Sequence, residues 1–414
     1  MLEQILEILF NVISIGSVLL LAALGLAIVF GLMGVINLAH GELMMLGAYS
    51  TYVVQQGFEL WAKDALDYYL WVALPVAFIF TALVGVLLEK GVIRFLYGRP
   101  LETLLATWGV SLILRQFVRS VDGVLLIGIA LFCLLFFGGM WVLRRRVNWE
   151  STRDRAIAIL LPLSLAITSI ASILLGKNEA LTNKWFGSRN LDITFPSWLD
   201  ENLSPENLPN WLAWLGNWMK SVGLEDFSVP RTRLFIIGLT IVCLLGVYLF
   251  LNRSNWGLRI RAVTQNRSMS ACLGIPTRQV DAFTFALGSG LAGIAGCAVT
   301  LIGSVGPNMG GNYIVDAFMV VVVGGVGNLF GSILAALGIS TANYLISVET
   351  FVPMFEALQT QVAFLKPLWE SFVTFFEFFG TSSMAKVLVF ALIIAFLQIR
   401  PAGIFPQKGR SVEL

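Results

Sequence analysis

The sequence predicts an all-α polytopic integral membrane protein with about ten to eleven transmembrane helices. Two features of the composition support this fold class: 57% of the 414 residues are hydrophobic and only 13% are charged, with a mean hydropathy of +0.83. Soluble globular proteins carry about 25% charged residues. The third feature is a series of apolar runs close to the roughly 20 residues that a helix needs to cross a bilayer. We therefore expect one continuous transmembrane domain over residues 1–414.

The expected membrane-spanning helices follow the apolar runs along the chain. They cover residues 8–32, 38–57, 69–90, 102–120, 124–143, 157–176, 232–251, 279–303, 314–330, 331–347 and 384–399. Lysine and arginine cluster after the third, fifth, seventh and last of these runs. With alternating spans, all four clusters fall on one side of the membrane, which the positive-inside rule identifies as the cytoplasm. The C-terminus is accordingly expected in the cytoplasm.

Two longer polar segments are expected on the opposite, extracytoplasmic face. The first, residues 186–230, contains Trp211, Trp214, Leu215 and Trp218 at helical spacing. This pattern predicts an amphipathic helix lying on the outer membrane surface, with a helix that docks a partner as the alternative. The second segment, 352–380, is rich in phenylalanine and fits either another interfacial helix or a segment that enters the bilayer.

Several motifs that would indicate an enzyme are absent or lack their context. The stretch GSGLAG at 288–293 matches a dinucleotide-binding pattern, but it lies inside an apolar run with no strand before it, so we interpret it as a helix-packing motif. The chain contains no P-loop, and its single histidine and four scattered cysteines suggest no metal site. We therefore expect no catalytic residues and no cofactor. We also expect no nucleic-acid partner, because the basic residues occupy loops between spans.

The stretch GLMGVINLAHGE, residues 31–42, interrupts the apolar pattern with Asn37, His40 and Glu42. Three glycines surround these polar residues, so we expect the helix to break here. Non-helical backbone at membrane depth is tolerated only under a cover of protein or along a water-filled cavity, and ionisable groups there suggest a functional site. The alternative is a polar hairpin at the cytoplasmic surface, with Asn37 capping the next helix.

The run that follows, ATWGVSLILRQFVR at 106–119, carries two arginines on one helix face, Arg115 and Arg119. Both fall towards the outer end of the span, which favours snorkelling to the headgroups over a place in a polar path. Hydrogen-bonding side chains on the same helix are Thr107, Ser111 and Gln116.

The segment 252–278 is expected to be a cytoplasmic loop that contains an amphipathic helix. The sequence WGLRIRAVTQNRSMSACLGIP predicts a helix that stops at Gly274, with Pro276 just beyond. A helix of this kind is suited to contact a soluble partner. The candidate coupling residues are Arg259, Arg261, Gln265, Asn266, Arg267 and Gly274.

Six ordered stretches resemble the LivH family, the permeases of ABC importers for branched-chain amino acids and related solutes, and within it the UrtB-type urea permeases. They are GVINLAHGELMMLGAYSTYVVQ, GRPLETLLATWGVSLILRQFVR, FGSRNLDITFPSWL, RAVTQNRSMSACLGI, NYIVDAFMVVVVGGVGNLFGSI and IRPAGIFPQKGRSVE. The resemblance covers most of the spans. Residues 121–185 depart from it and resemble an inserted transmembrane hairpin. Because the insertion adds an even number of spans, the sidedness of the flanking helices is unchanged.

The resemblance implies a multi-pass permease subunit of a bacterial inner membrane, paired with a second, related permease. Two cytoplasmic ATP-binding subunits would dock on the coupling segment, and a periplasmic solute-binding protein would deliver solute. The substrate expected from the resemblance is urea or a similar small amide, with branched-chain amino acids as the alternative. An ATP-independent channel, a secondary transporter and a purely structural subunit are the remaining alternatives. The expected substrate path contains Asn37, His40, Glu42, Thr107, Ser111, Gln116 and Asn312; Arg115 and Glu42 are the residues that would suit an amino acid.

Overall fold

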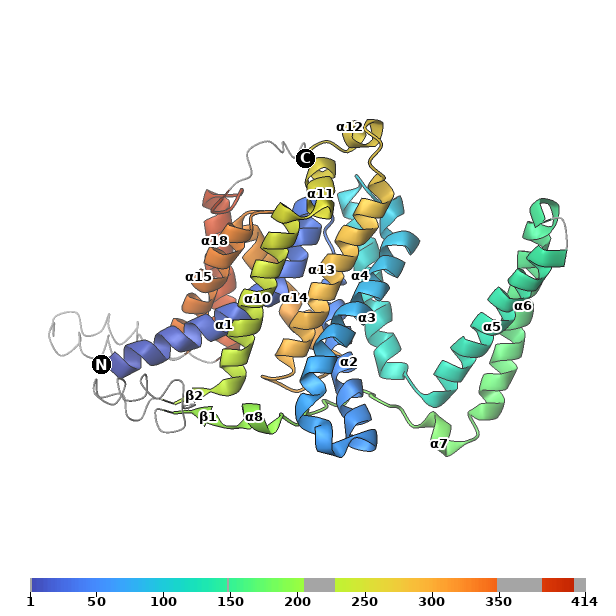
Figure 1. Ribbon diagram of the computed structural model, residues 1–414, viewed down its shortest axis with the longest axis horizontal. Helices are drawn as coiled ribbons and strands as arrows, with labels where there is room; N and C mark the ends of the chain where they lie inside the picture. The colour runs from blue at the N-terminus through green and yellow to red at the C-terminus, as the bar shows by residue number, and fades with distance from the viewer. Residues whose placement is uncertain (1, 147–148, 205–227, 348–381, 406–414) are drawn as a thin grey trace. The chain divides into compact units, whose positions relative to one another are not determined.

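The computed structural model describes residues 2–146, 149–204, 228–347 and 382–405. The chain folds into two compact units. The main unit comprises Met1–Ser111 with Asp192–Leu414, and the hairpin unit comprises Leu112–Leu191. Helices dominate both units, as Figure 1 shows, and the described residues include one small antiparallel sheet of β1 (Asn202–Leu203) and β2 (Val229–Pro230). The predicted all-α polytopic membrane fold is confirmed.

The helices of the main unit follow the apolar runs of the sequence. In chain order they are α1 (Leu2–Ile28), the π-helical turn η1 (Val29–Met33), α2 (His40–Trp61), η2 (Lys63–Tyr68), α3 (Tyr69–Gly91), η3 (Ile93–Phe95), α4 (Pro100–Ser120, which continues into the hairpin unit), α8 (Ser197–Asp200), α10 (Arg231–Arg253), α11 (Asn255–Gln265), α12 (Arg267–Cys272), α13 (Thr277–Val299), α14 (Met309–Gly324), α15 (Leu329–Ser347) and α18 (Ser382–Ile399).

Within the described residues, seven helical stretches are long and apolar enough to cross a membrane, and α14 and α18 are shorter apolar helices. The predicted span 314–330 is wrong in its bounds, because α14 already ends at Gly324. The chain then turns through two glycines in the left-handed region, Gly325 with φ 99° and Gly327 with φ 84°. The interfacial helix predicted around 211–218 and the segment 352–380 lie outside the described residues.

Helix α13 is the centre of the main unit and packs against α1, α2 and α3. Its GSGLAG stretch brings the helices together: a Cβ atom added at Gly293 would lie 2.5 Å from the carbonyl oxygen of Ala77 in α3. A Cβ at Gly288 would lie 2.8 Å from the carbonyl oxygen of Gly25 in α1. These approaches require glycine, and the interpretation of this motif as a helix-packing motif is confirmed.

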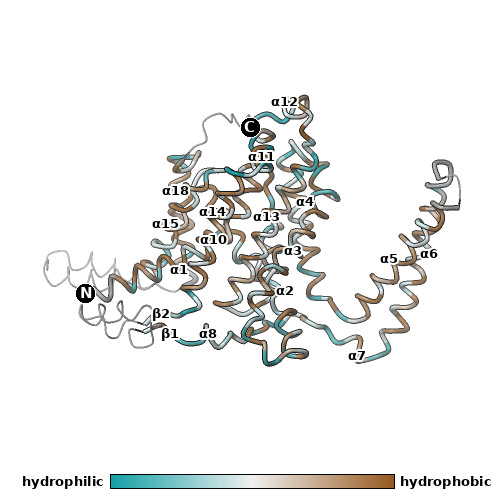
Figure 2. The backbone as a smooth tube through the Cα atoms, viewed as in Figure 1, coloured by the Kyte–Doolittle hydropathy of each residue, from teal (hydrophilic) through white to brown (hydrophobic). Residues whose placement is uncertain are grey.

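The main unit has two polar ends, which we call the α12 end and the β1 end. Figure 1 shows α11 and α12 at one end of the helices, with β1, β2 and α8 at the other. In Figure 2 the helices between them are mostly brown, or hydrophobic, and teal hydrophilic residues gather at the two ends. At the α12 end, the tail after α18 pairs with the end of α14, where the Ile404 N–H donates to the Val323 carbonyl at 2.8 Å.

The hairpin unit contains α5 (Gly123–Arg146), α6 (Trp149–Leu175) and α7 (Glu179–Thr182). Helices α5 and α6 run antiparallel: Gly128 faces Ser172 near one end of the pair, and Gly139 faces Leu160 near the other. The Trp185 N–H donates to the Val121 carbonyl at 3.0 Å and brings the ends of the unit together. The spans predicted at 124–143 and 157–176 are therefore two helices packed on each other.

Candidate functional site

The first helix breaks where the sequence predicted a break. After η1 the backbone turns at Gly34, with φ 69°, and α2 begins only at His40. The His40 Nε2–H donates to the carbonyl oxygen of Ala22 at 3.0 Å. Ala22 precedes Met33 by about three turns, or about 16 Å of helix rise, so the chain doubles back over residues 34–39. We call residues 29–39 the break.

Protein encloses the polar side chains at the break, whereas Gly34 at its turn is exposed. Asn37 and His40 have 0% of their surface exposed, and Glu42 has 1%. This burial disfavours the alternative of a polar hairpin at the membrane surface, and it gives these side chains the protein cover that polar groups need at membrane depth. Asn37 does not cap α2 as the alternative predicted: the N-cap residue is Ala39, and the Asn37 Oδ1 accepts from the N–H of that residue at 3.1 Å.

Thr107 of α4 satisfies backbone groups that the break leaves without helical partners. Its Oγ1 accepts from the Leu38 N–H at 3.1 Å and lies 3.4 Å from the Ile36 carbonyl oxygen. The same hydroxyl lies 3.1 Å from the carbonyl oxygen of Leu104 in its own helix. Thr107 therefore joins α4 to the break, which explains a polar residue on this apolar helix.

We expect Thr107→Val to reduce the free energy of unfolding by about 1–3 kcal/mol, because it leaves the buried Leu38 N–H without an acceptor. Thr107→Ser keeps the hydroxyl and should retain most of the stability. The measurement is thermal or denaturant unfolding in detergent. The matched control is Thr341→Val, because within the described residues that hydroxyl bonds the Leu337 carbonyl of its own helix. Equal stability of Thr107→Val and the wild type would contradict the assigned role.

Three further polar side chains pack beside the break. The Ser111 Oγ donates to Glu42 Oε1 at 3.2 Å. Because His40 donates through Nε2, its Nδ1 is a bare acceptor. Within the described part of the chain, neither His40 Nδ1 nor Asn37 Nδ2 has a hydrogen-bond partner. Unsatisfied polar atoms this deeply buried are costly and rare, which makes the break the candidate functional site.

Glycines bring α14 and the turn after it against the break. A Cβ added at Gly41 would lie 2.2 Å from the Gly310 carbonyl oxygen, and one at Gly31 would lie 2.3 Å from the Cα of Gly327. Real Cβ atoms do not approach other atoms this closely. The break and the start of α2 therefore contact two elements that follow about 270–300 residues later in the sequence.

The structure brings five of the seven predicted path residues together, namely Asn37, His40, Glu42, Thr107 and Ser111. The other two are not part of this cluster. Gln116 is an exposed residue of the hairpin unit, where its Nε2 donates to the Ser120 hydroxyl at 3.3 Å. Asn312 is exposed on the first turn of α14. Arg115 and Arg119 also belong to the hairpin unit.

The coupling segment contains two helices, so the expected single helix is wrong. Helix α11 ends at Gln265, and Asn266 adopts an extended conformation with φ −152° and ψ 100°. Its side chain accepts from the Met269 N–H at 3.0 Å and caps α12. The predicted stop is confirmed, because Gly274 has φ 80° just after α12.

Helix α11 connects the coupling segment to the break. Its buried residues Ile260 and Val263 pack with Val280 of α13 and with Leu32 of η1. The Thr264 Oγ1 donates to the Leu32 carbonyl oxygen at 3.1 Å. A displacement of α11 would therefore act directly on η1.

The outer surface of α11 and α12 displays both charged and apolar side chains. All six predicted coupling residues are exposed: Arg259, Arg261, Gln265, Asn266, Arg267 and Gly274. Leu258, Met269 and Leu273 are exposed beside them, and the sequence analysis missed these three. Their sequence spacing gives no signal, because an apolar residue on a short helix normally faces the core.

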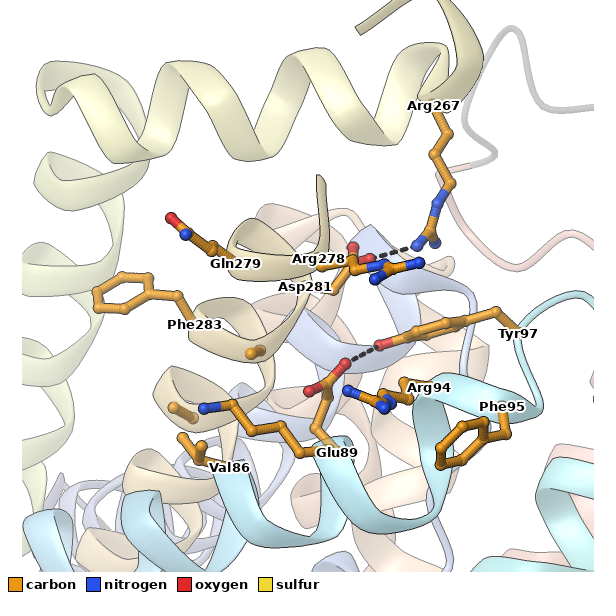
Figure 3. A pocket seen from close by; sticks show the side chains of 13 residues that line it. Val86, Glu89, Arg94, Phe95, Tyr97, Arg267, Arg278, Gln279, Asp281 and Phe283 are labelled. Atoms are coloured by element: carbon orange, nitrogen blue, oxygen red, sulfur yellow. Dashed lines mark hydrogen bonds and ion pairs between the residues drawn. The ribbon is translucent and has the colours of Figure 1, made fainter. Parts of the chain in front are cut away.

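A charged cluster of Glu89, Tyr97, Arg267 and Asp281 lies at the α12 end, lining a cavity of about 490 Å³ (Figure 3). Arg267 pairs with Asp281 at 2.5 Å, and its guanidinium lies 4.7 Å from the centroid of the Tyr97 ring. The Tyr97 hydroxyl donates to Glu89 Oε1 at 3.2 Å. Burial raises the pKa of Tyr97, so the phenol stays protonated and keeps donating.

This charged cluster connects α12 with the ends of α3 and α13. The sequence analysis predicted Arg267 as a coupling residue but missed its partners. Glu89 and Asp281 did carry a signal, because each is a carboxylate at the edge of an apolar span.

Comparisons with known proteins match most of the chain. The family model described as "Branched-chain amino acid transport system / permease component" matches residues 8–123 and 216–397. The high-affinity branched-chain amino acid transport system permease protein LivH of Escherichia coli is 25% identical over 345 residues, which cover 83% of this chain and 86% of LivH. The corresponding protein BraD of Pseudomonas aeruginosa is 23% identical over 339 residues, covering 81% of this chain and 84% of BraD. No solved structure matches the chain significantly.

Proposed function

We propose that this chain forms part of the membrane path of an ABC importer for a branched-chain amino acid. The chain belongs to the family of permease components of branched-chain amino acid transport systems, whose model matches more than half of it. The observation that supports this assignment of the substrate is the match to LivH and BraD over more than four-fifths of the chain. Both relatives are named for branched-chain amino acids. The alternative substrate of the sequence analysis is therefore favoured over urea, which none of these comparisons supports.

The proposed importer contains a second, related permease, two ATP-binding subunits and a periplasmic solute-binding protein. The chain is a transport subunit, and ATP hydrolysis is assigned to the partner chains because the sequence has no P-loop. The exposed surface of α11 and α12 supports an ATPase contact, since it combines arginines with apolar side chains.

The α12 end is assigned to the cytoplasm of a bacterial inner membrane, which also assigns the C-terminus there. The positive-inside rule supports this orientation. A group of basic residues gathers at this end, namely Lys90, Arg94, Arg99, Arg253, Arg259, Arg261 and Arg278. The family model leaves residues 124–215 unmatched, which supports the proposal that 121–185 is an inserted hairpin.

In the proposed mechanism, the break is the gate of the path. Movement of the ATPases displaces α11, and the Thr264–Leu32 hydrogen bond and the shared apolar core pass this displacement to η1. Opening of the break exposes Asn37 and His40, whose unsatisfied atoms then find partners in water or solute. Glu42, Thr107 and Ser111 hold the closed form, and Gln116 and Asn312 are proposed as polar path residues outside the gate.

The test is uptake of labelled leucine and labelled urea by cells in which this single chain is deleted and then restored. We expect deletion to abolish high-affinity leucine uptake, restoration to recover it, and urea uptake to stay unchanged. Loss of urea uptake without loss of leucine uptake would overturn the assignment of a branched-chain amino acid as the substrate. Leucine uptake by proteoliposomes that contain this chain without ATPase subunits would instead overturn the importer and favour a channel or secondary transporter.

A further inference from the structure

A separate cavity of about 280 Å³ lies within the main unit, towards the β1 end. Arg233, in the first turn of α10 directly after β2, places it at that end. Residues from α1, α10, α14, α15 and α18 line it. The volume is slightly below the roughly 300–1,000 Å³ of typical small-molecule sites, which suits a small solute.

The cavity contains one acid, Asp316, and two bases, Arg233 and Lys386, contributed by three different helices. Arg233 donates to Asn11, whereas Lys386 pairs with the acid. Lys386 Nζ of α18 lies 3.5 Å from Asp316 Oδ2 of α14. Charge-assisted hydrogen bonds are normally about 2.7–2.9 Å long, so this pair is loose. The Asp316 side chain is only 7% exposed, whereas that of Lys386 is 51% exposed. Lys386 is therefore the more accessible member of the pair, and it lines the cavity.

The rest of the lining is mainly apolar on one side. Ile15, Val18 and Leu19 of α1 face the cavity, and Asn343 of α15 adds an amide. Ionisable groups within membrane-spanning helices are costly and usually mark a solute or ion path. Here the two opposite charges stand beside an aliphatic wall, and a free aliphatic amino acid carries the matching groups on one small molecule.

We propose that this cavity binds a zwitterionic aliphatic amino acid during transport. Lys386 contacts the carboxylate, Asp316 contacts the ammonium group, and the α1 residues contact the aliphatic side chain. Solute entry replaces the loose ion pair with two shorter charge-assisted contacts, so neither protein charge is left unpaired. The assignment rests on the proposed function and deepens it, because a neutral solute such as urea would leave both charges without a matching partner.

A second cavity, of about 450 Å³, adjoins the first and shares Ile15 and Arg233 with it. Glu7, Asn11 and Asn202 line this cavity, which makes it more polar and places it beside β1. Arg233 donates a hydrogen bond to Asn11 Oδ1 where the two cavities meet. A solute arriving at the β1 end would thus cross a polar chamber before it reaches the charged pair.

The first test compares Asp316→Asn and Lys386→Gln with the double variant Asp316→Asn/Lys386→Gln. We expect each variant, the double included, to lower leucine uptake at saturating binding protein by about tenfold or more, since a charge-assisted contact to solute is lost. If the pair were only structural, the double variant would leave no unpaired charge and uptake would recover. Recovery in the double variant, or unchanged uptake in both single variants, would overturn the proposal.

The matched control is Arg231→Gln, which breaks the ion pair of Arg231 with Glu201 at the same end of the main unit, outside the cavity. Its uptake should stay within twofold of the wild type. All variants are compared at equal amounts in the membrane. Failure of the wild type itself to take up leucine would reject the proposed function, whereas normal uptake by the double variant would reject only this site.

A measurement on the wild-type assembly keeps the site testable even if the variants do not fold. Purified importer without its binding protein is heated with leucine, with 4-methylvalerate, which lacks the ammonium group, or with isoamylamine, which lacks the carboxylate. We expect leucine to raise the melting temperature and the two analogues to leave it unchanged at equal concentration. Stabilisation by either analogue equal to that by leucine would overturn the two-charge assignment.

Discussion

Gly41→Ala is expected to destabilise the protein strongly and to abolish uptake, although it adds a single methyl group. That methyl group would lie 2.2 Å from the Gly310 carbonyl oxygen and 2.8 Å from the Gly310 carbonyl carbon. Both atoms belong to backbone, so neither can rotate away. Overpacking costs about 1–3 kcal/mol where side chains can adjust, and we expect about 3 kcal/mol here. Separation of α2 from α14 would also open the break.

The measurement is the melting temperature in detergent together with leucine uptake. Gly57→Ala is the matched control, because Gly57 lies on the same helix and a Cβ there would meet nothing within 4 Å. Since alanine favours a helix over glycine by about 1 kcal/mol, this control should be neutral or slightly more stable. A Gly41→Ala protein as stable as the control would show that α2 and α14 are not in contact through this glycine.

The second large effect is expected from Arg267→Gln. This variant should reduce the amount of leucine transported per ATP hydrolysed by about tenfold. A tenfold change corresponds to the loss of about one charge-assisted hydrogen bond. Arg267 holds α12 to α13 through Asp281 and contacts Tyr97, which in turn bonds to Glu89 at the end of α3. Without the guanidinium, the ATPase could displace α12 without moving the transmembrane helices. Hydrolysis should continue while uptake falls.

The control is Arg99→Gln, at the same end of the main unit but outside the segment 252–278. The Arg99 side chain is exposed and pairs with Glu102 of its own helix turn at 3.1 Å. Exposed contacts of this kind contribute little, so the transport ratio should change by less than about twofold. The ratio is measured in proteoliposomes containing the whole importer and its binding protein. An unchanged ratio in Arg267→Gln would mean that this arginine serves membrane orientation and not coupling.

The positions of most long apolar helices along the chain could be predicted because hydropathy is a local property. A run such as 232–251 is apolar whatever surrounds it, and α10 occupies Arg231–Arg253. The same holds for the break, since glycines and polar residues at 31–42 disfavour a continuous apolar helix. The bounds of α14 were missed because the run 314–330 stays apolar through Gly325, whose positive φ is a backbone property that hydropathy does not record.

The contents of the candidate site could be predicted only in part. The sequence identified Asn37, His40 and Thr107 because polar side chains stand out in apolar runs, where they are costly and usually functional. The pattern did not show that Thr107 accepts from Leu38, or that α11 bonds to η1 through Thr264. Those contacts join residues 69 and 232 positions apart.

The sequence by itself determined the membrane fold, the order of its spans, the broken first helix and the family. Only the tertiary structure decided that α2 begins beside Ala22 inside the main unit, that Arg267 pairs with Asp281, and that Asp316 and Lys386 share one cavity. The physical reason is the range of the forces involved. The free energy of transferring a segment into the bilayer is a sum over its own residues. Helix contacts depend instead on close packing between surfaces that are remote in sequence.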